Sequence, residues 1–360
     1  MNKTDFSSFE VGTVFNDVSL SHELRPETSS VTVSYPSRLE AMALDPSKIA
    51  DNTNLVYEAG QIDFSVALYK HISVSLSDSH DQIAISDRTS RKSLVRHAAL
   101  IMRHAMGIKH GLDIDVEDDV DLRHCGLGSS SSLIAGTAAA INELYGKPIA
   151  PLDLVRFTAQ NHVEEIDEDD SKLVPVQCIG GSAVCGHFEG GAIILAGQAT
   201  PIFSTQIPED IKVVIGIPID FDHPDSQQLM QAEIDNIEGF KDSGERYGNE
   251  IAHRLLHKVM PDMARGSLKE CKDLIFDYRW DMGSIANCSF VYPRLNEIAD
   301  KLRWTKDDSD IEIISLSSVG PGFFCLTQNV DKVHDAFQDL GLTTHETSIH
   351  NGTYGVQKND

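Results

Sequence analysis

The sequence has few basic residues. Its 360 residues include 30 Lys and Arg against 55 Asp and Glu, which gives a formal net charge of −25. Such a field repels nucleic acids and anionic lipid surfaces, so we expect neither as a partner. No apolar run is long enough to span a bilayer, and the first thirty residues lack the charged-then-apolar pattern of a secretory signal. We therefore expect a cytoplasmic protein with a small-molecule substrate, and the sequence leaves a homodimer open.

Closely spaced cysteines are also missing. The six cysteines include no CxxC pair, so the sequence predicts neither a zinc site nor a disulfide framework. Cys178 and Cys185 are near enough in sequence to suggest a redox pair, but buried free thiols are the favoured interpretation.

Two common nucleotide-binding signatures are absent. No GK[ST] follows a glycine loop at the spacing of a Walker A motif. The stretch "GLGSSS" lacks the third glycine of a dinucleotide fingerprint, because Ser131 stands in its place. Neither a P-loop nor a Rossmann site is therefore expected.

What the sequence does have is "GLGSSSS" directly before a strong helical pattern. This turn comprises Gly126, Leu127, Gly128, Ser129, Ser130, Ser131 and Ser132. Glycines let a backbone approach a ligand closely, and the first amides of a helix have no intrahelical partner and face an anion favourably. One serine would satisfy an ordinary N-cap, so four serines after two glycines favour a phosphate-binding turn.

The hydrophobic pattern predicts alternating strands and helices. Strands are expected near 31–44, 54–77, 111–118 and 211–217, with a strand, a glycine turn and a strand over 311–329. Helices are expected over 92–107 and 129–145, with Gly146 at the C-terminal cap of the second. A further helix is expected over 150–170, a return to strand over 182–198, and helices through most of 226–304 and 330–341.

The loop resembles the phosphate loop of the GHMP kinase superfamily, which includes galactokinase, homoserine kinase and mevalonate kinase. Three further landmarks are similar and come in the same order. They are "YPSRLEAMALD" at Tyr35–Asp45, "HFEGGAIILAG" at His187–Gly197 and "SLSSVGPGFF" at Ser315–Phe324. "PSRL", "HCGLGS", "FEGG" and "SSVGP" also resemble the β-ribofuranosylaminobenzene 5′-phosphate synthase branch, although the late loop lacks the tryptophan and glutamine of that branch.

The resemblance implies a two-domain α+β fold. After an N-terminal extension over 1–30, residues 31–205 would form an ATP- and phosphate-binding domain like domain 2 of ribosomal protein S5. Residues 206–360 would form a ferredoxin-like α/β sandwich. The active site would lie in the cleft between them.

The resemblance also implies site residues. Ser130 would offer its hydroxyl to Mg²⁺, and Glu164 or Glu165 would complete that site, unless these glutamates belong to a solvated helix face. Ser318, Gly320 and Gly322 of the late loop would lie near the nucleotide phosphates.

The catalytic groups are less well defined by the sequence. Arg38 would meet a substrate anion or form a salt bridge, and His124 would donate to a phosphate or cap a strand. The superfamily's aspartate is not matched, because its position falls near Ser182 or Ala183; His187 and Asp170 are nearby candidate proton acceptors. The resemblance also implies that the segment between the first two strands lines the acceptor pocket, with Lys48, Asn54, Glu58 and Asp63 as candidate contacts.

The sequence therefore predicts a kinase that transfers the γ-phosphoryl group of ATP to a metabolite hydroxyl with Mg²⁺. Two alternatives stay open. One is a phosphoribosyl transferase like the synthase branch. The other is a non-catalytic nucleotide-binding protein on the same scaffold.

Overall fold

The computed structural model describes residues 8–15, 17, 18, 20, 24–44, 59–120, 122–166, 169–176, 178–222 and 224–359. The expected acceptor contacts Lys48, Asn54 and Glu58 lie outside these ranges. Among the residues it describes, no helix is both long enough and apolar enough to cross a membrane.

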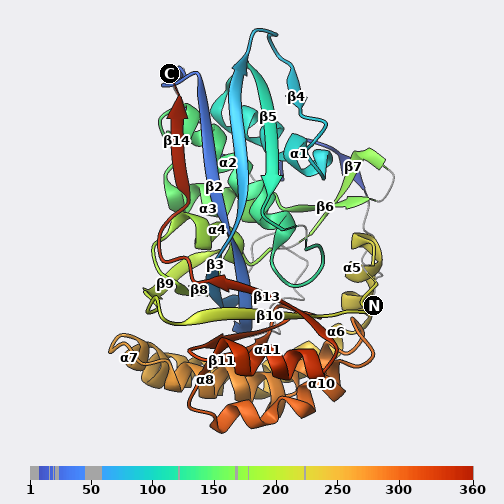
Figure 1. Cartoon of the computed structure of the whole chain (residues 1–360). Helices are drawn as coiled ribbons and strands as arrows, with labels where there is room; N and C mark the ends of the chain where they lie inside the picture. Colours follow the sequence, from blue (N-terminus) through green and yellow to red (C-terminus); the bar gives the residue numbers. More distant parts are fainter. Residues whose placement is uncertain are drawn as a thin grey trace.

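Two long antiparallel strands, β2 (Ser30–Leu44) and β3 (Gly60–Ser77), run from the upper half of the molecule into the lower half (Figure 1). They form the centre of a sheet with the order β14-β2-β3-β5-β4, to which β8 and β9 are added through β3. The other strands are β4 (Ile83–Ile85), β5 (Gly111–Asp118), β8 (Ala192–Ala196), β9 (Thr200–Thr205) and β14 (Gly355–Asn359).

Helices cover one face of this sheet and bury a shared apolar core. They are α1 (Lys92–Met106), α2 (Ser129–Leu144), α3 (Pro151–Gln160) and α4 (Gly181–His187). Inward residues of the sheet, such as Val33 and Ile72, pack against Ile101 of α1 and Ile141 of α2 in that core. A small sheet with the order β1-β7-β6 lies at the edge, formed by β1 (Phe9–Glu10), β6 (Val163–Ile166) and β7 (Asp169–Pro175).

The lower half contains an antiparallel sheet with the order β11-β12-β10-β13. Its strands are β10 (Lys212–Pro218), β11 (Ile311–Leu316), β12 (Phe323–Thr327) and β13 (Leu342–Ser348). Its helices are α5 (Ser226–Asp235), α6 (Ile237–Arg254), α7 (Met260–Met263), α8 (Lys269–Phe276), α9 (Ser284–Asn287), α10 (Leu295–Lys301) and α11 (Val330–Asp339), with π-helical turns at Leu255–Val259 and Asp277–Asp281 and a 3₁₀ turn at Arg303–Asp307. In Figure 1 most of these helices lie below the sheet, whereas α5 lies above β10 at the right. This strand–helix–strand–strand–helix–strand arrangement is ferredoxin-like, and the expected α+β class is confirmed.

The two halves share a core. The rings of Phe64 on β3 and Phe324 on β12 lie 6.0 Å apart, within a cluster that also contains Leu39 and Ile215. The chain then returns to the upper half, where β14 pairs with β2 through Gly355 opposite Ser34. The division at residue 205 stays a prediction, and contacts across it hold the two halves together.

Two predicted elements were wrong. The helix expected over 150–170 ends at Gln160, and Glu164 lies on strand β6 instead. Asn161 ends the helix because its side-chain amide donates to Phe157 O and its carbonyl accepts from Phe15 N. Most of helix α4 lies in the range 182–198 where a strand was expected, and only β8 within that range is a strand. Pairing of β6 with the next strand β7, and of β7 with the distant β1, supplies hydrogen bonds that local periodicity does not reveal.

Candidate active site

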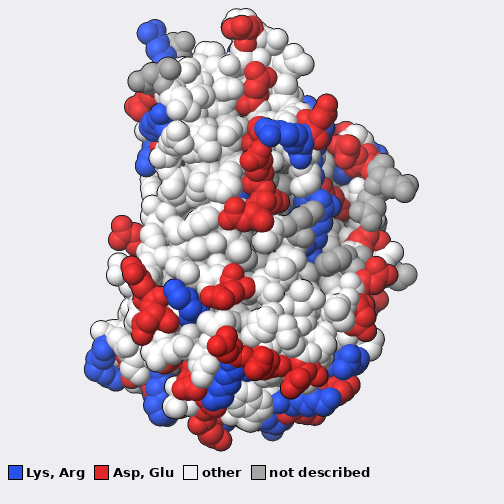
Figure 2. Space-filling model, in the orientation of Figure 1, with Lys and Arg blue, Asp and Glu red and all other residues white. Residues whose placement is uncertain are grey.

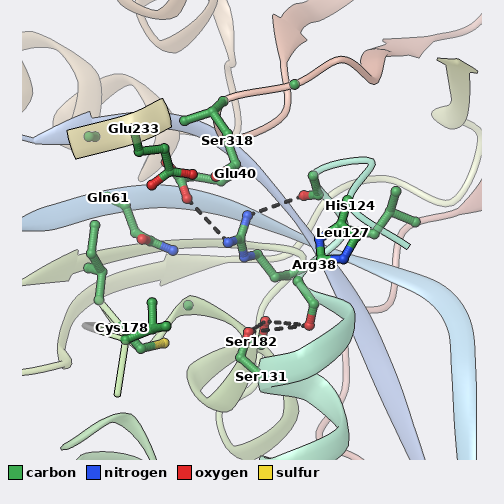
Figure 3. A pocket seen from close by; sticks show the side chains of 18 of the residues that line it. Arg38, Glu40, Gln61, His124, Leu127, Ser131, Cys178, Ser182, Glu233 and Ser318 are labelled. Carbon is green, nitrogen blue, oxygen red and sulfur yellow. Dashed lines mark hydrogen bonds and ion pairs between the residues drawn. The ribbon is translucent and has the colours of Figure 1, made fainter. Parts of the chain in front are cut away.

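A cavity of 260 Å³ lies at the start of α2, between the two halves of the molecule. Figure 3 shows side chains from both halves pointing into it. The upper half contributes the glycine turn, Arg38, Glu40 and the segment around Ser182, and the lower half contributes α5, Arg279 and the late loop. The predicted phosphate turn therefore borders open space rather than packed side chains.

The two glycines of the turn have conformations that other residues rarely adopt. Gly126 has φ 85° and Gly128 has φ 65°. A Cβ atom on Gly126 would lie 2.3 Å from the carbonyl oxygen of Ser317, and one on Gly128 would lie 2.3 Å from Ser182 Oγ. Both backbone shape and close approach therefore require glycine at these positions.

The serines that follow divide between two sides of the helix start. Ser129 and Ser131 line the cavity together with Leu127. Ser132 is fully buried, and its hydroxyl has no hydrogen-bond partner among the described residues. Because the first amides of α2 have no intrahelical partner and carry the positive end of the helix dipole, the cavity wall at this point favours an anion.

Arg38 is the basic side chain at the centre of Figure 3. It lies 3.3 Å from a carboxylate oxygen of Glu40 and 3.8 Å from one of Asp63, and its Nη1 donates to Gly126 O at 3.3 Å. Its Nε is buried and has no hydrogen-bond partner in the described part of the chain. These contacts are long for charge-assisted bonds, so Arg38 retains capacity to bind a ligand oxygen. Burial raises the pKa of Asp63 to about 7, even though Arg38 opposes that shift.

The late loop meets the glycine turn from the lower half. Ser318 and Gly320 line the cavity, and Ser317 Oγ donates to Gly126 O at 2.6 Å. Arg279 fixes this junction because its guanidinium donates to the carbonyl oxygens of Ala41 at 2.8 Å and Ser318 at 3.0 Å. The loop is thus held against the start of α2 by bonds between distant parts of the chain.

Acidic side chains face the cavity opposite the helix start. Glu233 of α5 points toward Glu40 and Arg38 in Figure 3. Burial and the nearby charges of Glu40 and Glu164 raise the pKa of Glu233 to about 7. A carboxyl group with such a pKa can exchange a proton near neutral pH.

The two expected metal ligands are brought together. Ser130 Oγ donates to Glu164 Oε2 at 2.8 Å. Burial alone would raise the pKa of Glu164, but hydrogen bonding from His162 and the charge of Arg91 lower it to about 2. Arg91 also bonds directly to Ser130 and Glu164, so a side-chain cation already contacts both oxygens. This arrangement does not fit a metal ion at the same place.

Other expected residues lie apart from the cavity wall. His187 is buried against Tyr35, its Nδ1 lies 2.8 Å from Ala183 O, and burial lowers its pKa to about 4. Asp170 is exposed on β7. A Cβ atom on Gly322 would lie 2.5 Å from Cys125 O, behind the turn. The roles of these three residues stay predictions, and none of them lines the cavity.

Two other residues that the sequence analysis considered, Ser182 and His124, lie on the cavity wall near the turn. Ser182, where the superfamily's aspartate was sought, lines the cavity and bonds to Ser131 Oγ at 2.9 Å. His124 also lines it, with Nε2 3.3 Å from Ser226 Oγ. The cysteines Cys178 and Cys185 are both free; Cys185 is buried as expected, whereas Cys178 is partly exposed and lines the cavity.

Sequence analysis missed Arg91, Glu233 and Arg279. Each is an ordinary charged residue within a helical pattern or next to one, and none belongs to a recognisable motif. No local signal marks them, because their partners are far away in sequence.

The distribution of charged residues on the surface reflects the excess of Asp and Glu in the sequence. Figure 2 shows acidic residues over the upper and lower parts of one face, with Lys and Arg among them. An anionic ligand therefore depends on the local positive features of the cavity rather than on the overall field.

Comparison with known families identifies part of the chain. Residues 93–169, which include the glycine turn and α2, match the GHMP kinases N terminal domain. This segment is similar to the N-terminal domain of GHMP kinases. The predicted resemblance is thereby confirmed for the part of the chain that contains the phosphate turn.

The curated relatives that the chain matches are distant in sequence. It is 27% identical over 104 residues to 4-diphosphocytidyl-2-C-methyl-D-erythritol kinase of Desulfitobacterium hafniense, covering 29% of the chain and 36% of that relative. It is 22% identical over 289 residues to beta-ribofuranosylphenol 5'-phosphate synthase of Archaeoglobus fulgidus, covering 75% of the chain and 82% of that relative. It is 28% identical over 150 residues to homoserine kinase of Thermoplasma volcanium, covering 41% and 47%. The chain thus spans less than half of either kinase.

Solved structures confirm the GHMP kinase fold over nearly the whole chain. Mevalonate diphosphate decarboxylase of Staphylococcus aureus superposes with a TM-score of 0.63 at 13% identity, covering 92% of this chain and 98% of that one. Homoserine kinase of Cytophaga hutchinsonii gives 0.57 at 14% identity, covering 94% and 100%. A third structure, with a TM-score of 0.62 and 15% identity, is of a complex with AMPPCP and magnesium and covers 92% and 100%.

Proposed function

We propose that this protein transfers the γ-phosphoryl group of ATP to a hydroxyl group of a small metabolite. The observation that carries the proposal is the cavity wall formed by Gly126–Ser129 and Arg38. Phosphoryl transfer depends mainly on positioning and on electrostatic stabilisation of the phosphate oxygens. Helix amides and a guanidinium with spare donors supply both.

The cavity divides naturally between donor and acceptor. The phosphates would lie against the start of α2, with the late loop at Ser318–Gly320 covering them from the lower half. The acceptor would occupy the side lined by Gln61, Cys178 and Glu233. As the bond between the γ-phosphorus and the bridging oxygen breaks, Arg38 would stabilise the charge on the transferred group.

Glu233 is the proton acceptor that we assign in this reaction. It lines the cavity from α5, and its raised pKa suits a group that takes a proton from an attacking hydroxyl near neutral pH. It would take the place of the aspartate that the sequence lacks. We assign no step to a metal ion between Ser130 and Glu164, because Arg91 bonds to both.

Release of ADP from ATP tests the proposal directly. The protein is incubated with ATP and a panel of hydroxyl-bearing metabolites, and ADP is measured with wild type, Arg38→Met and the surface control Arg88→Met. Turnover that depends on one class of acceptor, is lost in Arg38→Met and persists in Arg88→Met supports a kinase. No ADP with any acceptor contradicts it.

The synthase-like match favours a second candidate. The alignment to the Archaeoglobus fulgidus synthase covers far more of the chain than the kinase alignments do. A phosphoribosyl transferase would use the same helix start to bind the pyrophosphate of phosphoribosyl pyrophosphate. Release of pyrophosphate from that donor, with no binding of ATP, would favour this candidate over the kinase.

A further inference from the structure

Beside the cavity, the start of α2 also contacts a buried arginine that does not itself line the cavity. Arg91 donates from Nη1 to Ser129 Oγ at 2.9 Å and from Nη2 to Ser130 Oγ at 2.7 Å. The same guanidinium bonds to Glu164 at 3.0 Å and to Glu165 at 2.6 Å. Its side chain is only 5% exposed. Arg91 thus links two hydroxyl groups of the phosphate turn to two carboxylates of β6.

These contacts use the oxygens that a magnesium ion would need. Mg²⁺ requires a near-octahedral set of oxygens at about 2.0–2.1 Å. Here, one guanidinium nitrogen of Arg91 contacts both Ser130 Oγ and Glu164 Oε2, and the hydroxyl proton of Ser130 points to the carboxylate. An ion at this place would have to displace the guanidinium. The residues present therefore fit an arginine and not a metal ion.

The backbone holds Arg91 in this position. Arg91 precedes α1 and has φ 55° and ψ 46°, in the left-handed region. Residues other than glycine keep this conformation only where the surrounding structure fixes it. Ser93, in the first turn of α1, donates to the other oxygen of Glu165 at 3.2 Å, so this carboxylate is held both by Arg91 and by α1. The helix start and β6 thus fix the arginine from both ends of its side chain.

We propose that Arg91 is the resident cation of this site and keeps a divalent ion from binding between Ser130 and Glu164. The guanidinium offsets part of the negative charge of Glu164, which lines the cavity and would otherwise repel a phosphate group at the start of α2 more strongly. The benefit to phosphate binding rests on the proposed function, whereas the exclusion of the ion does not.

Binding of Mn²⁺, measured by electron paramagnetic resonance on the full chain without nucleotide, tests the exclusion. The acidic surface will bind some Mn²⁺, so the measurement compares wild type with Glu164→Gln. We expect the same number of bound ions in both. The loss of one tight site in Glu164→Gln would overturn the proposal.

Replacing Arg91 should create a metal site between Ser130 and Glu164. In Arg91→Met we expect one additional Mn²⁺ site and stabilisation by Mg²⁺, and both should disappear in the double variant Arg91→Met/Glu164→Gln. Arg88→Met is the matched control, because it removes an arginine three residues away that pairs with exposed parts of β5. A folded Arg91→Met variant that gains no site would overturn the proposal, and if it does not fold, the wild-type comparison decides.

Binding of AMPPCP separates this inference from the proposed function. We expect wild type to bind the analogue with less than a threefold change in affinity between EDTA and Mg²⁺. Binding that needs Mg²⁺ and is lost in Glu164→Gln would overturn the role of Arg91. Absence of binding under every condition would contradict the proposed kinase, and the Mn²⁺ measurement would still decide the inference.

Discussion

Two arginines flank the start of α2, and they differ in how fully they are paired. Arg91, behind the helix, contacts hydroxyl and carboxylate oxygens at 2.6–3.0 Å. Arg38, in front of it, has contacts of 3.3–3.8 Å and a buried Nε without a hydrogen-bond partner among the described residues. A saturated guanidinium holds structure together, whereas an unsaturated one beside a cavity can bind a ligand. An anion would therefore find guanidinium donors on the side of the helix that contains Arg38, because those of Arg91 already have partners.

The largest effect on stability should come from replacing Arg91, whose guanidinium is fully paired. Arg91→Met leaves Glu164 and Glu165 partly buried without their cation, so we expect a loss of about 3–5 kcal/mol in the free energy of unfolding. Denaturant titration measures it. The exposed control Arg88→Met should cost at most about 1 kcal/mol, and equal losses in the two variants would contradict the comparison.

The next largest effect should come from the turn that separates the two sides. Gly128→Ala places a Cβ near Ser182 and strains a positive φ, so the turn must move and we expect binding of AMPPCP to weaken roughly 100-fold. Gly107→Ala is the matched control. Gly107 has a similar φ of 63° and nothing within 4 Å of an added Cβ.

Both glycine variants should lose about 1–2 kcal/mol of stability from the left-handed backbone alone. Only Gly128→Ala should lose ligand affinity, as measured by calorimetry. Intact binding in Gly128→Ala would mean that the ligand does not use this turn.

A smaller effect is expected on the unsaturated side. Arg38→Met removes a charged donor that faces the cavity, so binding of the analogue should weaken by about 1.5–3 kcal/mol. The unfolding midpoint should fall less than in Arg91→Met, because the contacts of Arg38 with Glu40 and Asp63 are long. The opposite pattern, with Arg91→Met impairing binding alone, would reverse the assignment of the two arginines.

The smallest expected effect is a pH dependence of ligand affinity that arises from Glu233 in the cavity. The raised pKa of Glu233 means that its carboxyl is neutral below about pH 7 and negative above it. Because the added charge repels a phosphate, affinity for AMPPCP should fall a few-fold as pH rises through this range. Affinity titrations of wild type and Glu233→Gln from pH 5 to 9 measure it, and an unchanged pH profile in the variant would exclude Glu233 as the cause.

The sequence predicted the glycine turn and the helix after it because their signals are local. Each of these features depends on residues that are adjacent in sequence: the positive φ at Gly126 and Gly128, the apolar stripe of α2 and the glycine near its end. It also predicted that Ser130 and Glu164 would meet, through a resemblance and not through periodicity. It placed Glu164 on a helix, whereas pairing with β7 makes that segment a strand.

By itself, the sequence determined that this acidic α+β molecule has a glycine turn followed directly by a helix, since backbone conformation and helix formation depend on near neighbours. Only the tertiary structure decided which charges meet there. Arg91 is 38 residues from Ser129 and 73 from Glu164, and Glu233 comes from the other half of the chain. Such contacts form only when the long strands and the lower sheet have packed, and no local pattern specifies them.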